Sequence, residues 1–347
     1  MTTTVGHWID NKEVPSTSGR TAPVYDPALG VETKRVALAN AAEINAAIAS
    51  AKKAFPGWSK TSLAARQQIV FKFRELLNAK KGELAEIITS EHGKVLSDAL
   101  GEITRGQEVV EFAVGMPQLI KGYYSENVST GVDVYSTRQA LGVVGIISPF
   151  NFPAMVPMWF YPIAIAAGNT VVLKPSEKDP SASIWIAKIW KEAGLPDGVF
   201  NVLNGDKESV DGLLHSPDVE SISFVGSTPI ARYIYEECAR AGKRVQSLGG
   251  AKNHMLVLPD ADLDPCLSTG IPAAAVTTEA IELMFTVPKR SPPVPTMSTA
   301  SLPVFSSTAF SNITSTRPAN SATVSPLERS AIMKAPIFPS VASPAMI

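Results

Sequence analysis

Cysteine and histidine are scarce in this chain of 347 residues, which holds two cysteines and four histidines. The thiols of Cys238 and Cys266 cannot build a disulfide framework, and the histidines are scattered, so the sequence predicts neither disulfide bonds nor a metal site. An excess of charge is missing too, because 31 Lys+Arg face 32 Asp+Glu and leave a formal net charge of −1. This balance argues against nucleic acid or an anionic membrane as the main partner.

Long apolar runs are also absent. The most apolar stretch, residues 155–167, is interrupted by Pro157 and Pro162 and falls short of the ~20 residues that cross a bilayer. The N-terminus has neither an apolar signal region nor an Arg-rich amphipathic pattern. We therefore expect a cytoplasmic protein.

Glycine and tryptophan nearly vanish from the last 82 residues (266–347), which contain one of the 23 glycines and none of the five tryptophans. The same stretch holds 11 prolines, 23 Ser/Thr and only 8 charged residues. Prolines recur there too often for helices or central strands. We predict one folded domain over residues 1–264 and a largely irregular, Ser/Thr/Pro-rich tail over residues 265–347.

Within the first part, apolar periodicity predicts helices at 41–54, 61–91 and 97–120, which would form a helical cover, followed by a β-hairpin at 122–139. Short apolar runs then alternate with amphipathic helices, which indicates a parallel sheet covered on both faces. The fold class expected is therefore α/β, with a doubly wound, Rossmann-like sheet. Strands are expected at 142–147, 170–173, 199–203, 221–224, 244–247 and 255–258, and helices at 154–167, 181–193, 207–215 and 228–241.

The common nucleotide fingerprints, G-x-G-x-x-G and G-x-x-x-x-G-K-[ST], are missing. In open α/β sheets, however, ligands bind at the carboxyl ends of the strands, and four predicted strands end in polar or small residues. We expect a cofactor along this edge of the sheet. The residues concerned are Ser148-Pro-Phe150-Asn151, Lys174-Pro-Ser-Glu177-Lys178, Gly205-Asp206 and Gly226-Ser227.

Five segments, in this order and spacing, resemble the aldehyde dehydrogenase superfamily: ISPFNFP (147–153), GNTVVLKPSEKDP (168–180), GLPDGVFNVLNG (194–205), FVGSTPIA (224–231) and LGGAKNH (248–254). Ser247 stands before the last segment where most members carry a glutamate, which resembles the CoA-acylating methylmalonate-semialdehyde (malonate-semialdehyde) dehydrogenase branch. The resemblance covers about residues 5–264. It implies NAD as cofactor, a small semialdehyde and coenzyme A as substrates, and a homo-oligomer for the intact form, with 122–139 as its oligomerisation arm.

For the cofactor, the resemblance assigns Lys174 and Glu177 to the adenosine ribose of NAD. An ammonium can donate to one ribose hydroxyl while a carboxylate accepts from another, and the carboxylate disfavours the 2′-phosphate of NADP. Lys178 is expected to line the same site. The alternative is an ion pair on a surface loop.

Gly226 and Ser227 precede the predicted helix 228–241, whose free N–H groups suit a pyrophosphate, although Ser227 also fits a plain N-cap. The resemblance places Ser148 and Phe150 on the turn over which the cofactor passes, and Gly249 beside the nicotinamide. It also assigns Asn151 to the oxyanion, where one such donor contributes ~3 kcal/mol. A turn-capping amide is the alternative for Asn151.

The family's chemistry needs a cysteine thiolate, which forms a thiohemiacetal, passes hydride to NAD and leaves a thioacyl-enzyme. A serine at 247 fits release to coenzyme A, because a missing general base slows hydrolysis. The nucleophile should follow LGGAKNH by about thirty residues. That position falls near Glu282, with no thiol; Cys266 lies too early, and Cys238 belongs to a helix.

These observations suggest the hypothesis that residues 1–264 are the cofactor-binding part of such a dehydrogenase, altered after Asp264 by a frameshift, a splicing error or truncation. The chain as written is not expected to oxidise aldehydes. Two alternatives are a non-catalytic NAD-binding protein with a new tail, and a fragment that does not fold stably because an apolar face stays uncovered. The sequence does not separate methylmalonate from malonate semialdehyde.

Overall fold

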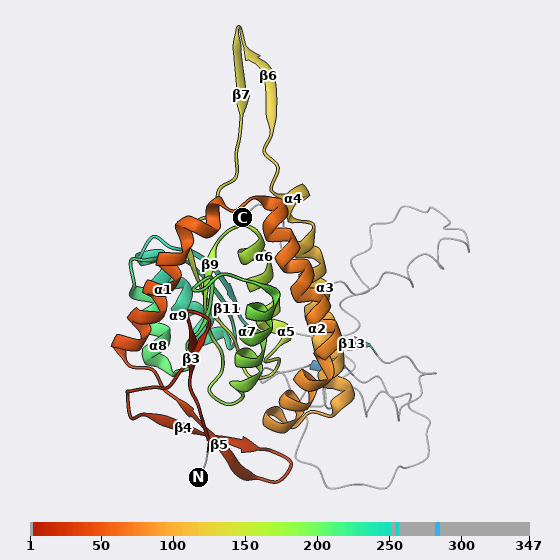
Figure 1. Ribbon diagram of the computed structural model, residues 1–347, viewed down its shortest axis with the longest axis vertical. Helices are drawn as coiled ribbons and strands as arrows, with labels where there is room; N and C mark the ends of the chain where they lie inside the picture. Colours follow the sequence, from red (N-terminus) through yellow and green to blue (C-terminus); the bar gives the residue numbers. More distant parts are fainter. Residues whose placement is uncertain (1–2, 251–253, 257–281, 285–347) are drawn as a thin grey trace, which may run out of the picture. The chain divides into compact units, whose positions relative to one another are not determined.

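The computed structural model describes residues 3–250, 254–256 and 282–284 (Figure 1). Side-chain surroundings are described for residues 3–250. Strands β13 (His254–Leu256) and β14 (Glu282–Met284) pair with each other in a small sheet. The rest of the predicted tail, including Cys266, lies outside the described residues.

The main sheet has seven strands in the order β12-β11-β8-β9-β10-β2-β3. Its parallel part begins in the middle with β8, grows to one side through β9 and β10, and then returns to add β11 and β12 on the other side of β8. This order confirms the predicted doubly wound fold and places its topological switch point between β8 and β11. The parallel strands are β8 (Val143–Ile147), β9 (Thr170–Lys174), β10 (Phe200–Val202), β11 (Val219–Val225) and β12 (Arg244–Leu248).

Two hydrophobic cores lie on opposite faces of this sheet, because successive side chains of a strand point to opposite sides. In β8, Val144 and Ile146 belong to one core and Val143 and Ile147 to the other. The first core packs against α2 (Leu63–His92), α3 (Leu96–Val114) and α7 (Ser181–Ala193), and the second against α1 (Ala41–Lys60), α8 (Lys207–His215) and α9 (Thr228–Arg240) (Figure 1). The predicted helical cover is thus divided between both faces.

Local signals set the ends of the long helices. Asn40 and Glu43 form a capping box at the start of α1, in which each side chain accepts from the other residue's N–H at 3.0 and 2.9 Å. Helix α2 ends at Gly93, which takes the left-handed conformation with φ 86° that glycine adopts without strain. These ends agree with the predicted helices to within a few residues, apart from the C-terminal extension of α1 to Lys60.

Two predicted helices are broken. The helix expected at 97–120 ends at Val114, and a short α4 (Met116–Leu119) follows Gly115. The helix expected at 154–167 is divided into α5 (Met155–Met158) and α6 (Tyr161–Ala166). Proline lacks an N–H donor and clashes with the preceding turn, so Pro162 fits only where it stands, in the first turn of α6.

The N-terminal strands were not predicted. Strands β2 (His7–Ile9) and β3 (Lys12–Val14) extend the main sheet in the antiparallel sense, and β1 (Thr3–Val5), β5 (Val31–Ala37) and β4 (Thr21–Asp26) form a separate sheet. Most of these strands are short and polar, with burial patterns that do not alternate cleanly. They therefore carry little of the period-two signal by which strands are recognised.

The predicted hairpin is present as β6 (Tyr124–Ser129) and β7 (Val132–Tyr135), joined through Thr130 and Gly131. It projects away from the sheet and its helices (Figure 1), and every residue of both strands is exposed. No helix in the described part of the chain has the length and apolar character to span a membrane.

Candidate functional site

The parallel strands end level with one another at the switch point. Ile147 pairs with Lys174 on one side and with Phe224 on the other, and Val225 pairs with Leu248. The residues that follow, Ser148, Gly226 and Gly249, therefore leave the sheet along a single edge. Three of the four predicted strand ends meet here, together with the end of β12.

Lys174 and Glu177 are in contact, with 3.0 Å between Lys174 Nζ and Glu177 Oε2. The lysine side chain is 7% exposed and the glutamate side chain 38%, so this is not an ordinary surface ion pair. Burial acts to raise the pKa of Glu177, but the Lys174 ammonium, hydrogen bonds and Lys178 together hold it below its ordinary value. The carboxylate is therefore ionised at neutral pH and partly open to a ligand.

Two nitrogen-bearing side chains contact the ring of Phe150, in the loop after β8. Lys178 Nζ lies 4.4 Å from the centroid of the Phe150 ring, and the His92 ring stacks on it at 6.1 Å between centroids. Burial, assisted by the charge of Lys94, lowers the pKa of His92 to about 4. Phe150 is 41% exposed. Part of the ring is therefore open to a planar ligand.

Ser148 and Asn151 follow β8 and contribute unsatisfied polar atoms. Ser148 is buried, its N–H donates to the carbonyl of Lys174 at 3.2 Å, and its Oγ has no hydrogen-bond partner in the described part of the chain. Asn151 Oδ1 is likewise buried and unpaired among the described residues. Because buried polar atoms nearly always find partners, two such atoms on one loop indicate a place for a polar ligand.

Sequence reasoning missed the two residues that hold this loop. Lys94 Nζ lies 2.6 Å from Glu102 Oε2 and donates to the backbone carbonyl of Asn151 at 2.9 Å. Glu102 Oε1 accepts from the N–H groups of Ala154 and Met155 at 2.8 and 3.1 Å. A signal was available, since Glu102 stands within the buried stripe of α3, where a carboxylate needs partners.

At the other side of the switch point, Ser227 occupies the N-cap position of α9, but its side chain makes no capping hydrogen bond. Ser227 is an exposed residue, and its carbonyl accepts from Ala231 N–H at 2.9 Å. A Cβ at Gly249 would lie 3.1 Å from Thr228 Oγ1 and 3.3 Å from its Cα. Gly249 therefore lets β12 pass close to the first turn of α9.

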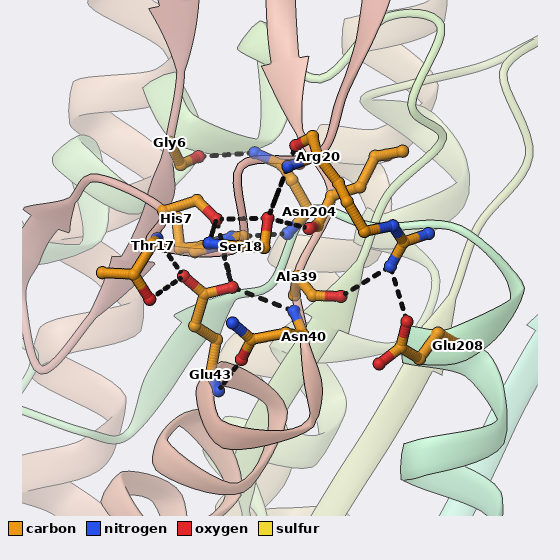
Figure 2. A network of polar contacts seen from close by, with 12 residues as sticks. Gly6, His7, Thr17, Ser18, Arg20, Ala39, Asn40, Glu43, Asn204 and Glu208 are labelled. Carbon is orange, nitrogen blue, oxygen red and sulfur yellow. Dashed lines mark hydrogen bonds and ion pairs between the residues drawn. The ribbon is translucent and has the colours of Figure 1, made fainter.

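Gly205-Asp206, the fourth predicted strand end, was expected to face a ligand. This prediction is wrong, because Asp206 is occupied by contacts within the protein. Asp206 caps α8 by accepting from Glu208 N–H, and it also pairs with Arg20. Asn204 N–H donates to Nδ1 of the fully buried His7 at 3.2 Å, and Figure 2 shows this network between the N-terminal segment and the strand end. Burial lowers the pKa of His7 despite the carboxylate of Glu43, so the ring is neutral.

Two residues tied to the expected chemistry have structural contacts. Cys238 lies on α9 and is fully buried in the core, and burial raises its pKa to about 11, which disfavours the thiolate. Ser247 Oγ donates to the carbonyl of Ala231 at 2.6 Å. The Ser247 hydroxyl is thus hydrogen-bonded to the backbone of α9.

Comparison with known proteins matches this geometry to one family. The profile of the aldehyde dehydrogenase family matches residues 14–279. The malonate-semialdehyde dehydrogenase of Pseudomonas aeruginosa is 52% identical over 268 residues, which is 77% of this chain and 54% of that protein. The chain thus spans about half the length of the curated relatives it matches.

Solved structures agree. A methylmalonate-semialdehyde dehydrogenase from Sinorhizobium meliloti, crystallised with NAD, is 50% identical, with a TM-score of 0.76 over 79% of this chain and 56% of that one. An NADP-dependent enzyme of Escherichia coli is 31% identical, with a TM-score of 0.73 over 79% of this chain and 57% of that one. The family profile covers well over half of the sequence. The chain belongs to the aldehyde dehydrogenase family.

Proposed function

We propose that residues 1–264 are the NAD-binding part of a CoA-acylating dehydrogenase of malonate or methylmalonate semialdehyde, and that the chain as written binds NAD without oxidising an aldehyde. The observation that carries this proposal is the contact between Lys174 and Glu177 at the end of β9, on the same edge of the sheet as the N-terminus of α9. The names of the relatives from P. aeruginosa and S. meliloti support the substrate class.

Lys174 and Glu177 suit the adenosine ribose. The lysine ammonium can donate to a ribose hydroxyl, and the ionised carboxylate can accept from one while repelling a 2′-phosphate. The solved neighbours include both a complex with NAD and an NADP-dependent enzyme, so the fold admits either cofactor. The choice of NAD therefore depends on Glu177.

The remaining polar groups fit the rest of NAD. Ser227 and the first turn of α9 suit the pyrophosphate, because a helix N-terminus presents free N–H groups and a partial positive charge. The unpaired hydroxyl of Ser148 and the exposed ring of Phe150 offer partners along the same edge, and Gly249 lets the chain after β12 lie close to α9. Lys178 adds a positive charge beside Phe150. When bound, NAD would supply a hydride acceptor.

Asn151 suits the aldehyde. Its side-chain amide can donate a hydrogen bond to a carbonyl oxygen that gains negative charge, an interaction of ~3 kcal/mol in comparable oxyanion holes. The Lys94–Glu102 ion pair fixes the backbone on both sides of this residue. A preorganised donor of this kind needs no rearrangement during the reaction.

The nucleophile is what the chain lacks. Its two cysteines are Cys238, which is buried, and Cys266, which follows LGGAKNH too closely for the family's spacing. Ser247 offers no carboxylate to activate water, so an intact relative would release its acyl group to coenzyme A. We attribute the change in composition after Asp264 to a frameshift, a splicing error or truncation. We place the intact form in the cytoplasm, as an oligomer.

The first test is a calorimetric titration of the 347-residue chain with NAD, joined to an assay for NADH with methylmalonate semialdehyde and coenzyme A. We expect micromolar binding and no NADH. Lys174→Met should weaken binding about ten-fold or more, since a charge-assisted hydrogen bond is lost. Lys80→Met, which removes a surface lysine paired with Glu192, is the matched control.

Other results of the titration and the assay would contradict particular parts of the proposal. NADH formation would refute the missing nucleophile, and a folded chain that does not bind NAD would refute the cofactor site. A chain without a cooperative melting transition would favour the unstable-fragment alternative.

The coding sequence provides an independent test. We expect that sequencing the gene and transcript around codon 264, with translation of all three frames, will reveal a cysteine in a G-E-R-C-like context about thirty residues beyond LGGAKNH. Confirmation of the present tail in the mature transcript would instead leave the non-catalytic NAD-binding protein as the better description.

A further inference from the structure

Arg66, in the first turn of α2, is a buried cation without a counter-charge among the residues that the structure describes. It is 6% exposed, and its Nε and Nη1 atoms are buried with no hydrogen-bond partner among the described residues. Nor does its guanidinium form an ion pair in that part of the chain. Arg74, farther along the same helix, differs sharply, because it pairs with Glu75 and Glu111.

The guanidinium is held in place by backbone packing. A Cβ placed on Gly168 would lie 1.9 Å from Arg66 Nη1, so the group rests directly against this glycine. Gly168 has φ +98°, a conformation that other residues rarely adopt. Gly168 is thus favoured by its own backbone conformation, and a side chain there would have to displace the Arg66 guanidinium.

Arg66 lines a hollow at the base of the hairpin. Its volume is about 270 Å³, enough for about nine waters. Gly122 shapes it, because a Cβ there would lie 1.7 Å from the carbonyl oxygen of Ser136 on the opposite arm. The lining residues are Leu63, Arg66, Ile120, Gly122, Ser136, Thr137 and Arg138.

In the described part of the chain, the charged side chains that line this hollow are all positive. Its lining contains two arginines and no acidic residue, and the first turn of α2 has no acidic residue either. The partial positive charge of the α2 N-terminus adds to the same field. A buried charge with no partner is strongly unfavourable, so the hollow favours an anion.

We propose that this hollow is a binding site for a carboxylate, held by the guanidinium groups of Arg66 and Arg138. Arg66 Nε and Nη1 are closed to solvent, so Arg66 Nη2 and the Arg138 guanidinium would each donate to one oxygen of the carboxylate. Leu63 and Ile120 add apolar wall for a short aliphatic stem. The ligand class is therefore a small aliphatic carboxylate, either free or at the end of an Asp or Glu side chain from a second copy of the chain. The site is separate from the proposed cofactor site and does not depend on it.

The test is the thermal stability of the full chain in sodium propionate, compared with sodium chloride and sodium phosphate at equal ionic strength. We expect a saturable rise in Tm with propionate only. Arg66→Met should abolish this rise and, without propionate, should be at least as stable as the parent, because an uncompensated buried charge has been removed. Arg74→Met is the matched control and should keep the full response.

Arg138→Gln provides a second measurement on an exposed residue whose loss should not affect folding. It should weaken propionate binding about ten-fold. If a second copy supplies the carboxylate, sedimentation will show concentration-dependent association that propionate and Arg66→Met both abolish. The proposal is overturned if phosphate stabilises as well as propionate, or if neither stability nor association depends on Arg66 and Arg138.

Discussion

Lys94 and Glu102 form a buried ion pair with 2.6 Å between Nζ and Oε2, and together they hold both ends of the loop that carries Asn151. Their side chains are 10% and 0% exposed. The lysine comes from the connection between α2 and α3, and the glutamate from α3 itself. An ion pair among the helices on one face of the sheet therefore sets the geometry of the loop that follows β8.

Replacing Lys94 with Met should lower the free energy of unfolding by ~3 kcal/mol, since breaking a buried pair leaves the Glu102 carboxylate uncompensated. Chemical denaturation measures this change. Lys80→Met, which breaks an exposed pair with Glu192, should cost less than ~1 kcal/mol. Equal losses in the two variants would show that the Lys94 pair has no special role.

Glu177→Gln should reduce the discrimination against NADP. Removing the carboxylate removes its repulsion of a 2′-phosphate, so the ratio of the Kd values for NADP and NAD should fall about ten-fold. Titrations with both cofactors measure this ratio. Glu192→Gln, at the surface of α7, should leave it unchanged, and an unchanged ratio in Glu177→Gln would remove the carboxylate from the cofactor choice.

Much of the fold could be predicted because its signals are local. The unbroken apolar runs of β8 and β9 indicated buried strands, and the helices α7 and α8 begin and end at the predicted residues. The N-terminal strands could not be found in this way. His7 is fully buried only because β2 joins the far side of the sheet, next to β10.

The candidate site likewise contains residues that local patterns indicate and residues whose contacts are long-range. Strand ends with polar residues indicated Ser148, Lys174 and Ser227, since parallel strands bring their carboxyl ends to one edge. Asp206 satisfied the same rule, yet Arg20 from the N-terminal segment pairs with it, and that contact spans most of the chain. Residues joined over long sequence separations are beyond what a local pattern can show.

Asn151→Ala should not destabilise the protein. Its Oδ1 is buried without a partner in the described residues, so alanine removes a desolvated acceptor and loses no hydrogen bond. Asn169→Ala is the contrasting variant, because that side chain accepts from the N–H groups of Leu141 and Gly142 at 2.6 and 3.1 Å. We expect it to lose ~2 kcal/mol in denaturant unfolding. A comparable loss in Asn151→Ala would favour the turn-capping alternative.

The stability of the protein should fall as the pH is lowered from about 6.5 toward 4, partly because of His92. Burial and the charge of Lys94 lower the pKa of this histidine to about 4 in the folded protein, against 6.5 for a free side chain. Between these values the unfolded chain binds a proton that the folded protein does not, so acid favours unfolding by up to ~1.4 kcal/mol per pH unit. Below the folded pKa this contribution is constant.

His92→Gln isolates this effect. His7, whose pKa burial also lowers, contributes the same sign in parent and variant, and buried Asp179, whose pKa burial raises, contributes the opposite sign in both. The free energy of unfolding of the variant, minus that of the parent, should therefore increase as the pH falls from 6.5 to 4.5. A flat difference for His92→Gln would mean that the imidazole beside Phe150 is as free to protonate in the folded protein as in the unfolded chain.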